Sequence, residues 1–320
     1  MLAADTLITD LLSFERVAID YLRRKYSIET DCLQSVLEEL KQKGFRIETD
    51  AESVHLLDIP DILYPEIVRY GLKSNLIGSH IIHYMETGST NSEAMDLCRA
   101  GAVQEGTVII SEHQTAGRGR YNRIWEDTPS MSILCSIVLN PFFLRLNGLF
   151  SLTVIATLSI IEAVRESTGI ELSVKWPNDI YFKERKVAGV LIETQSQSDR
   201  ICWAVMGIGL NINQPEVFFS DIIYPAVSLC VAAGKQLNRY QVCAKLLEHL
   251  DRSYEALKKG AYDQLFARWQ AYCSSISRII LFNGPDGKSS GVIQAVMPDG
   301  GLSVVKQSGE TVNVQNGEIQ

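Results

Sequence analysis

From about residue 78 onward, short β-rich runs alternate with helical segments, and this alternation constrains the fold more than any other feature of the chain. Strands are predicted where apolar residues cluster over a few positions, at 107–114, 132–139, 172–176, 187–194 and 201–212. Apolar spacing of three and four residues predicts helices at 92–99, 150–166 and 240–258. Because strands and helices do not alternate regularly, the pattern favours an α+β fold with a mixed sheet.

The first 75 residues have a different character. Segments 14–26 and 30–43 have helical spacing, with Thr30 or Asp31 as the expected cap of the second and Gly44 at its end. A β-hairpin is predicted over 45–61. Two helices followed by a hairpin are typical of a small winged helix-turn-helix domain.

The tail from about residue 273 is divided by turn dipeptides such as Asn-Gly, Asp-Gly and Ser-Gly into alternating runs of valine and isoleucine. This spacing predicts a small all-β barrel of roughly five strands. We therefore expect three domains, at 1–75, 78–272 and 273–320.

Composition and charge restrict the functions to consider. The net charge of −8 argues against a general nucleic-acid coat. The seven cysteines form no CxxC pair, which favours reduced thiols in a cytoplasmic protein. The histidines show no metal-ligand spacing, so no metal ligand is assigned. The apolar run at 149–164 is shorter than the ~20 residues of a membrane span and contains Glu162, which indicates a buried core helix and no membrane.

Residues 117–125, "GRGRYNRIW", concentrate positive charge in this acidic chain. The glycines let the main chain approach a ligand closely, and the arginines suit carboxylates and phosphates. Trp125 offers a flat face to a ring system. The loop therefore fits a ligand that carries both an anion and an aromatic. A solvated loop with chance arginines, or an RNA-binding segment, is the alternative.

A second candidate segment is "VKWPNDIYFKERKVAGVLIE", residues 174–193. Pro177 forces a turn, so the side chains of Asn178 and Asp179 are free at a strand end, where Asp179 suits Mg²⁺ or a charged group. A tight hairpin would return Lys186 to this corner, and Gly189 in mid-strand indicates close ligand approach. The alternative is a plain hairpin with surface lysines and a buried tryptophan.

Two weaker motifs accompany these segments. Ser89, Thr90 and Asn91 are small polar residues before a helix, where helix capping is the simpler explanation. Gly207, Gly209 and Asn211 lie on a predicted strand and would shape a wall for a base.

In this order the motifs closely resemble those of biotin protein ligases. The matching motifs are Gly-Ser-Thr-Asn, Gln-x-x-Gly-Arg-Gly-Arg-x-x-Arg-x-Trp, Lys-Trp-Pro-Asn-Asp, Arg-Lys-x-x-Gly and Gly-x-Gly-x-Asn-x-Asn. The resemblance covers about residues 80–320. It implies a mixed-sheet catalytic domain followed by an SH3-like β-barrel. The helical N-terminus is similar, more loosely, to the winged helix of bacterial ligases that also act as repressors.

The resemblance implies a two-step reaction. Biotin and ATP give biotinyl-5′-AMP and pyrophosphate, and the biotinyl group then passes to a lysine of a carrier protein. The first step brings a carboxylate against a phosphate, so it needs cationic screening and positioning more than a nucleophile. Arg118, Arg120, Arg123 and Lys186 would supply that screening, with Mg²⁺ on the phosphates.

Residue roles also follow from the resemblance. The implied biotin site consists of Ser89, Thr90, Asn91, Gln114, Gly117, Arg118, Gly119, Arg120, Lys186 and Gly189. The implied ATP site consists of Arg118, Arg123, Trp125, Asn178, Gly207 and Asn211. Catalytic roles fall to Arg120, Lys186 and Asp179. The chain departs from the family at Tyr121-Asn122, where many members have Arg-Gly.

The implied partner is the biotin carboxyl carrier domain of a biotin-dependent carboxylase, and a homodimer is possible. The alternatives are a bifunctional ligase and repressor, a lipoate–protein ligase relative, or a transcription factor that only senses a ligand. Residues 1–58 contain seven Lys/Arg and twelve Asp/Glu. Since duplex binding requires cations that neutralise phosphates, we expect the N-terminal domain not to bind DNA.

Overall fold

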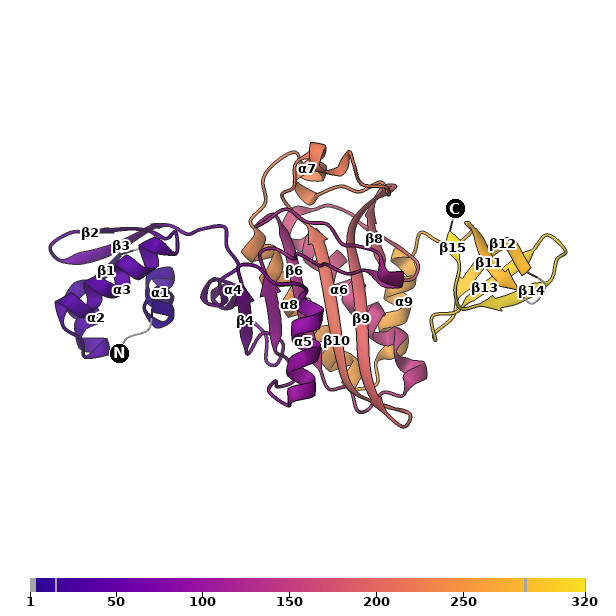
Figure 1. Ribbon diagram of the computed structural model, residues 1–320, viewed down its shortest axis with the longest axis horizontal. Helices are drawn as coiled ribbons and strands as arrows, with labels where there is room; N and C mark the ends of the chain where they lie inside the picture. The colour runs from indigo at the N-terminus through magenta and orange to yellow at the C-terminus, as the bar shows by residue number, and fades with distance from the viewer. Residues whose placement is uncertain (1–3, 15, 285–286, 320) are drawn as a thin grey trace.

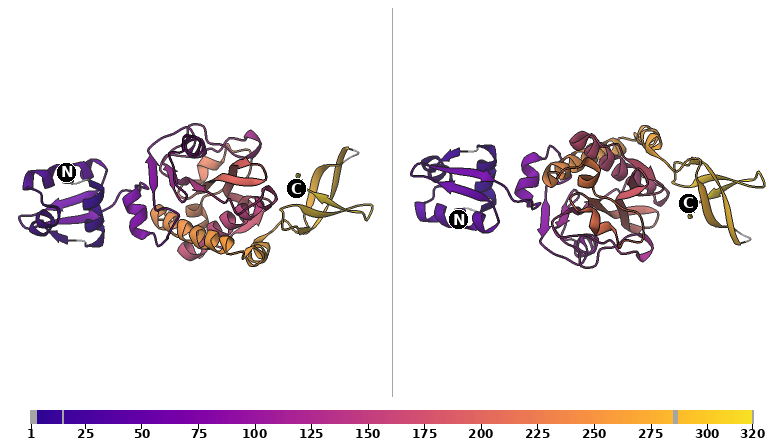
Figure 2. Two further views of the ribbon diagram at one scale, coloured as in Figure 1. Left: turned by 90° about the horizontal axis from the view of Figure 1, so that it is seen from below. Right: turned by 90° about the horizontal axis from the view of Figure 1, so that it is seen from above.

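The computed structural model describes residues 4–14, 16–284 and 287–319. Three bodies follow one another in a row along the longest axis of the molecule (Figure 1). A helical N-terminal unit and a C-terminal sheet lie at opposite ends, and the large central body separates them in every view (Figure 2).

In the described part of the N-terminal unit there are three helices and three short strands. They are α1 (Ala4–Ser13), β1 (Arg16–Ala18), α2 (Ile19–Tyr26), α3 (Thr30–Gln42), β2 (Arg46–Thr49) and β3 (Ser53–Asp58). The sheet order is β1-β3-β2, and both pairings are antiparallel. The hairpin expected over 45–61 is confirmed.

Two details of this unit differ from prediction. Segment 14–26 is not one helix, because Val17 is buried and pairs with Val54 before α2 begins. The predicted cap of α3 is wrong: Glu29 holds the N-cap position without a side-chain hydrogen bond, and Thr30 is the first helical residue. Gly44 does follow the helix, with the left-handed φ of 95° that favours glycine there.

The central body is built on a seven-stranded sheet of order β4-β5-β6-β10-β9-β8-β7. The strands are β4 (Ile81–Tyr84), β5 (Val108–Ser111), β6 (Ser132–Leu139), β7 (Ser173–Lys175), β8 (Asp179–Phe182), β9 (Arg185–Gln197) and β10 (Arg200–Asn211). Among the described strands of this sheet, β4 and β5 pair in parallel and the other neighbours are antiparallel. The predicted mixed α+β sheet is therefore confirmed.

Helices cover both faces of this sheet. Helix α5 (Thr90–Ala100) packs Ala94 and Cys98 on one face, against Ile109, Val138 and Val205. Three helices lie on the opposite side: α6 (Phe150–Thr168), α8 (Arg239–Lys258) and α9 (Tyr262–Tyr272). A short helix, α7 (Leu229–Ala233), comes between β10 and α8 in the chain.

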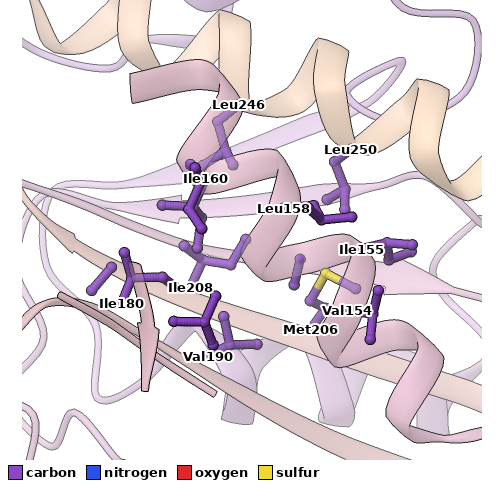
Figure 3. Packing of buried hydrophobic residues seen from close by; sticks show 14 of the residues in the cluster. Val154, Ile155, Leu158, Ile160, Ile180, Val190, Met206, Ile208, Leu246 and Leu250 are labelled. Carbon is purple, nitrogen blue, oxygen red and sulfur yellow. The ribbon is translucent and has the colours of Figure 1, made fainter. Parts of the chain in front are cut away.

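The apolar residues of α6 lie between the sheet and α8. Figure 3 shows Leu158 and Ile160 between Met206 and Ile208 of β10 and Leu246 and Leu250 of α8. Residues 146–168 are long and apolar enough to cross a membrane, but 72% of an apolar 18-residue window within them is buried inside the protein. The predicted core helix is confirmed.

Helix α4 (Pro65–Gly71) joins the N-terminal unit to the central body. Two consecutive residues of α4 pack in different hydrophobic cores: Ile67 in the core of the N-terminal unit and Val68 in the core of the central body. Just before α4, the Leu63 amide donates to Glu112 Oε1 at 2.8 Å. The linker is therefore bonded to the residue that immediately follows β5.

The C-terminal sheet has five antiparallel strands in the order β14-β13-β12-β11-β15. The strands are β11 (Ile279–Gly284), β12 (Gly287–Val296), β13 (Leu302–Lys306), β14 (Thr311–Val314) and β15 (Glu318–Ile319). Trp176, before the hairpin β7–β8 closes, donates its indole N–H to the Gly300 carbonyl at 2.8 Å. This bond holds the C-terminal sheet beside the Lys-Trp-Pro-Asn-Asp corner.

Candidate active site

A cavity of about 670 Å³ opens on the sheet face that also carries α5. Successive strand residues point to opposite faces, so Met206, Ile208 and Leu210 enter the core while Gly207, Gly209 and Asn211 line the cavity. A Cβ at Gly209 would lie 2.5 Å from the Trp125 ring, and one at Gly207 would lie 2.2 Å from Asn91 Oδ1. Both glycines therefore leave space that neighbouring side chains fill.

The polar end of the cavity is formed at the start of α5. Ser89 occupies the N-cap position but makes no cap hydrogen bond, which removes the simple capping explanation for this motif. Gln114 Oε1 accepts from the Thr90 amide at 2.8 Å and from Thr90 Oγ1 at 3.1 Å. The structure brings Ser89, Thr90 and Gln114 together in the lining of the cavity.

Asn91 is buried, and protein groups contact both ends of its side-chain amide. It donates to Glu193 Oε2 at 2.8 Å, and its oxygen accepts from Ser136 Oγ at 2.6 Å. Its contact with Gly207 places it at the cavity wall. In this structure Asn91 supports the wall and fixes Glu193.

The arginine loop, residues 117–125, folds into a narrow turn. The Gly119 amide donates to the Arg123 carbonyl at 2.7 Å, and Arg118 and Ile124 form a bridge behind it. Its three arginines have separate partners: Arg118 donates to Glu193 at 3.0 Å, Arg120 to Asn178 Oδ1 at 3.1 Å, and Arg123 lies 4.9 Å from the centre of the Tyr224 ring. Gly117 is packed against the Trp125 carbonyl, where a Cβ would lie at 2.5 Å.

The hairpin β8–β9 brings Lys186 to the predicted corner. Lys186 Nζ lies 2.7 Å from Asp179 Oδ1 and 5.6 Å from the Trp125 ring centre. Gly189 pairs with Asp179 across the strands, and a Cβ there would lie 3.2 Å from both Lys186 and Trp125. Trp125 is therefore held over the two glycines of adjacent strands, and its buried indole N–H has no hydrogen-bond partner among the described residues.

Asn211 lies at the far end of β10 and is buried at the cavity margin. Its amide donates to the Val227 carbonyl at 3.4 Å, and its oxygen accepts from Gln214 Nε2 at 3.1 Å. These bonds connect it to the segment after β10, from which Phe218, Ile222 and Tyr224 also reach the cavity. An apolar and aromatic end thus faces the polar end at Thr90.

Charge at the cavity is opposite to that of the chain. Six Lys/Arg side chains line it and only two Asp/Glu do, although the net charge of the protein is −8. Burial, with the charge of Asp179 adding to it, raises the pKa of Tyr181 to about 12, so this hydroxyl stays neutral at physiological pH. No group of three potential metal-ligating His, Cys, Asp or Glu side chains occurs within the described ranges.

The sequence did not identify several residues at the cavity. Glu193 holds Arg118 and Asn91 from beside it, and alternation with Gly189 and Leu191 on β9 is the signal for its direction. Phe218, Ile222 and Tyr224 after β10 were also missed. Further lining residues come from the C-terminal sheet and its turns: Leu281, Phe282, Asn283, Lys288, Asn316, Gly317 and Ile319. A pattern of turns and alternating valines gives no indication that this sheet closes one side of the cavity.

The arrangement suits a bipartite ligand. Amides and hydroxyls at one end offer neutral donors and acceptors, and aromatic side chains lie at the other end. Cations line the cavity from Arg118, bonded to Glu193 near the polar end, to Arg123, over Tyr224 at the aromatic end. Such a site binds a small polar ring, a pair of anionic groups and a planar base along one line.

Comparison with known proteins agrees with this geometry. The model of the family described as "Biotin/lipoate A/B protein ligase family" matches residues 86–211. The bifunctional ligase/repressor BirA of Bacillus subtilis is 31% identical over 242 residues, which are 75% of this chain and 74% of that protein. The biotin–[acetyl-CoA-carboxylase] ligase of Mycobacterium tuberculosis is 29% identical over 268 residues, 81% of this chain and 97% of that one.

Among solved structures, the biotin protein ligase from Aquifex aeolicus in complex with biotin and ATP superposes with a TM-score of 0.65. It is 29% identical and covers 76% of this chain and 98% of its own. The sheet and cavity define a ligase-type α+β catalytic domain, and the chain belongs to the biotin protein ligase family.

Proposed function

We infer that the protein is an ATP-dependent ligase that joins biotin to a lysine of a carrier protein through biotinyl-5′-AMP. The observation that carries this function is the excess of cations in one cavity between a polar end at Thr90 and an aromatic end at Tyr224. The likeness to ligases named for biotin and for acetyl-CoA carboxylase supports the substrate and a carboxylase carrier domain as the acceptor.

In the first step a biotin carboxylate oxygen attacks the α-phosphorus of ATP. The bond from that phosphorus to the bridging oxygen breaks, and pyrophosphate leaves. Two anions must meet, so the side chains that matter are those that reduce repulsion and hold the groups in line. We propose Lys186 and Arg120 for this role, because Lys186 is fixed by Asp179 and Arg120 by Asn178.

In the second step the carrier lysine attacks the acyl carbon and AMP leaves. Until then the mixed anhydride must be kept from water. We propose that the arginine loop does this, with Arg118 and Arg120 over the acyl-phosphate and Trp125 as the wall beneath it. Asp179 and Asn178, at the mouth of the β7–β8 turn, would orient the incoming lysine.

Mg²⁺ belongs to the same proposal. The cavity offers the Asp179 carboxylate but no cluster of three acidic, histidine or cysteine ligands within the described residues. That donor set fits an ion held mainly by substrate phosphates, as Mg²⁺ usually is. Asp179 would contact it, and the bound ion would neutralise phosphate charge.

For the domains we propose a winged helix at 1–75, the catalytic domain at 78–272 and an SH3-like barrel at 273–320. The first is supported by the element order α1, β1, α2, α3, β2, β3, and the last by five short antiparallel strands. A cytoplasmic location is supported by the seven free cysteines. We propose no operator binding, because the cations of the N-terminal unit already pair with its own acids.

The direct test is incubation of the full chain with ATP, Mg²⁺, biotin and a biotin carrier domain. We expect the intact mass of the carrier to increase by one biotinyl group, and pyrophosphate to exchange into ATP only when biotin is present. Replacing biotin with lipoate tests the alternative that the chain is a lipoate–protein ligase relative. Exchange with lipoate and none with biotin would overturn the assignment.

A further inference from the structure

Tyr121 holds an unusual position at the tip of the arginine loop. Its φ of 56° and ψ of 35° are left-handed, a conformation that costs a side-chain-bearing residue about 1–2 kcal/mol. The residue is also 70% exposed, so burial of its ring does not offset that cost. Specific contacts must favour this conformation, and they define what the residue does.

The hydroxyl of Tyr121 lies between two polar groups. It accepts from Arg120 Nη2 at 3.2 Å and donates to Asn316 Oδ1 at 3.2 Å. The Arg120 guanidinium also lies 5.0 Å from the centre of the Tyr121 ring, and its other terminal nitrogen donates to Asn178. A continuous chain of hydrogen bonds thus runs from Asn178 through Arg120 and Tyr121 to Asn316.

The far end of this chain rests on a firm support. Asn316 lies in the turn between β14 and β15, next to Gly317. A Cβ at Gly317 would lie 2.6 Å from Ile280, a fully buried member of the central hydrophobic cluster. Asn316 and Gly317 are exposed like the loop tip, but the close approach of Gly317 to the buried Ile280 anchors the turn on β11 and gives the loop a fixed point in the C-terminal sheet.

We propose that Tyr121 is a positioning residue that fastens the arginine loop to the C-terminal sheet and so sets how long Arg120 retains the acyl-adenylate. This inference rests on the proposed function of the cavity. It assigns a role to a residue at which the chain departs from the usual Arg-Gly of the family. Without the tyrosine hydroxyl, Arg120 keeps its bond to Asn178 but loses its link to the sheet.

If Tyr121 acted only by stacking its ring on Arg120, its hydroxyl would not matter. One substitution distinguishes stacking from hydrogen bonding. Tyr121→Phe keeps the ring over Arg120 and removes both hydrogen bonds. A net hydrogen bond is worth about 0.5–1.5 kcal/mol. We therefore expect biotinyl-5′-AMP to leave the full-length Tyr121→Phe variant about two- to twelvefold faster, with KM for biotin nearly unchanged.

Substitution of Asn316, which accepts the hydrogen bond from Tyr121, should have the same effect on adenylate release. Asn316→Ala is expected to match Tyr121→Phe, and the double variant to be no worse than either, because residues in one network are not additive. Asn316→Asp keeps an acceptor for the hydroxyl and should restore retention. Tyr121→Gly relieves the left-handed strain, so its unfolding temperature should not fall although the adenylate escapes quickly.

Matched controls remove equivalent groups away from the cavity. Tyr70→Phe removes another exposed tyrosine hydroxyl, on α4, and Asn313→Ala truncates an exposed asparagine on β14. Neither should change adenylate release. Wild-type release from Tyr121→Phe, or independent additive effects of Tyr121→Phe and Asn316→Ala, would overturn the proposal. Absence of biotin-dependent pyrophosphate exchange in the wild type would instead reject the proposed function.

Discussion

Lys186 Nζ lies 2.7 Å from Asp179 Oδ1, across the hairpin that joins β8 to β9. Both side chains are about one quarter exposed at the cavity, at 26% and 28%. The ion pair stops the lysine from extending into solvent and aims it at the space above Trp125. A carboxylate in this position keeps a cation ready for an arriving anion.

Lys186→Ala should strongly impair formation of the adenylate. Removing one preorganised charge from a transition state typically costs about 2.7–4 kcal/mol, which lowers the rate about a hundredfold to a thousandfold. Lys186→Arg should restore part of the activity, because the guanidinium is larger and planar. Single-turnover pyrophosphate release measures the effect. Lys183→Ala, in the turn of the same hairpin, is the control, and normal rates for Lys186→Ala would exclude Lys186 from the mechanism.

Gly209→Ala tests whether the cavity wall depends on Trp125. The new Cβ would lie 2.5 Å from the indole ring, so the ring must move. Overpacking of this kind costs about 1–3 kcal/mol, and we expect KM for biotin to rise about fivefold or more. A change in tryptophan fluorescence should accompany it. Gly148→Ala meets only ordinary contact with Leu144 and should leave both readouts unchanged.

Arg120→Ala should accelerate loss of the adenylate without loss of the fold. The side chain is only partly buried and makes its polar contacts to Asn178 and Tyr121. Hydrogen bonds from a charged donor are worth about 1.5–3 kcal/mol, so release should be about ten- to 150-fold faster. Rapid filtration of enzyme-bound adenylate measures this rate. A lowered unfolding temperature would indicate that the arginine is structural.

Much of the catalytic domain could be predicted because its signals are local. Strand β6 has the predicted bounds, and the corner at Asn178 and Asp179 follows from Pro177 and a tight hairpin. The two glycines of β10 predicted a wall for a base, and the structure shows that Trp125 and Asn91 occupy the space beside them. Contacts between distant segments had no local signal, which is why Asn316 was not foreseen.

The same reasoning explains errors at the N-terminus. Apolar spacing around Val17 fits a helix as well as a strand, and pairing with β3 decides between them.

The buried ion pair of Arg239 with Glu112 in the central body, 2.7 Å long, was also not predicted, since 127 residues separate the two. Charged residues are rarely buried unless paired, and sequence alone does not reveal the partner.

Glu112→Gln should lower the free energy of unfolding by about 3–5 kcal/mol, because it removes the buried carboxylate beside Arg239 and leaves the half-exposed Asp61, 3.8 Å away, as the remaining acidic partner among the described residues. Burial acts to raise the pKa of Glu112, but the His83 hydrogen bond and the Arg239 charge outweigh it, so the pKa lies below its ordinary value of 4.5. The stabilisation is therefore present above that value and lost as pH falls through the folded pKa.

Urea unfolding of wild type and Glu112→Gln across the acid range measures this contribution. We expect the difference between the two proteins to shrink below pH 4.5. Glu255→Gln, which disrupts only the exposed pair with Lys258 on α8, should change the free energy of unfolding by no more than about 1 kcal/mol. A constant difference at all pH values would contradict the assigned protonation.

The N-terminal unit carries the last prediction, which concerns DNA. A winged helix would present α3 and the β2–β3 turn to a duplex. Asp31, Gln34 and Glu38 are exposed on α3, and the nearby Lys41 donates to Glu38 at 2.7 Å. The turn carries Asp50 and Glu52 and no cation. The face that would approach phosphates is therefore mainly acidic.

The cations that remain are already used within the unit. Of the run at 23–25, Arg23 pairs with Glu29, Arg24 with Asp20 and Lys25 with Asp10, the last at 2.6 Å. Each phosphate contact would require breaking such a pair, and affinity falls further as salt rises. We expect no sequence-specific binding tighter than micromolar to promoter DNA of the organism's own biotin operon, at moderate salt with biotin and ATP present. Fluorescence anisotropy, with scrambled DNA as the control, measures this. Specific, salt-dependent binding below micromolar would restore the repressor function of the BirA relatives.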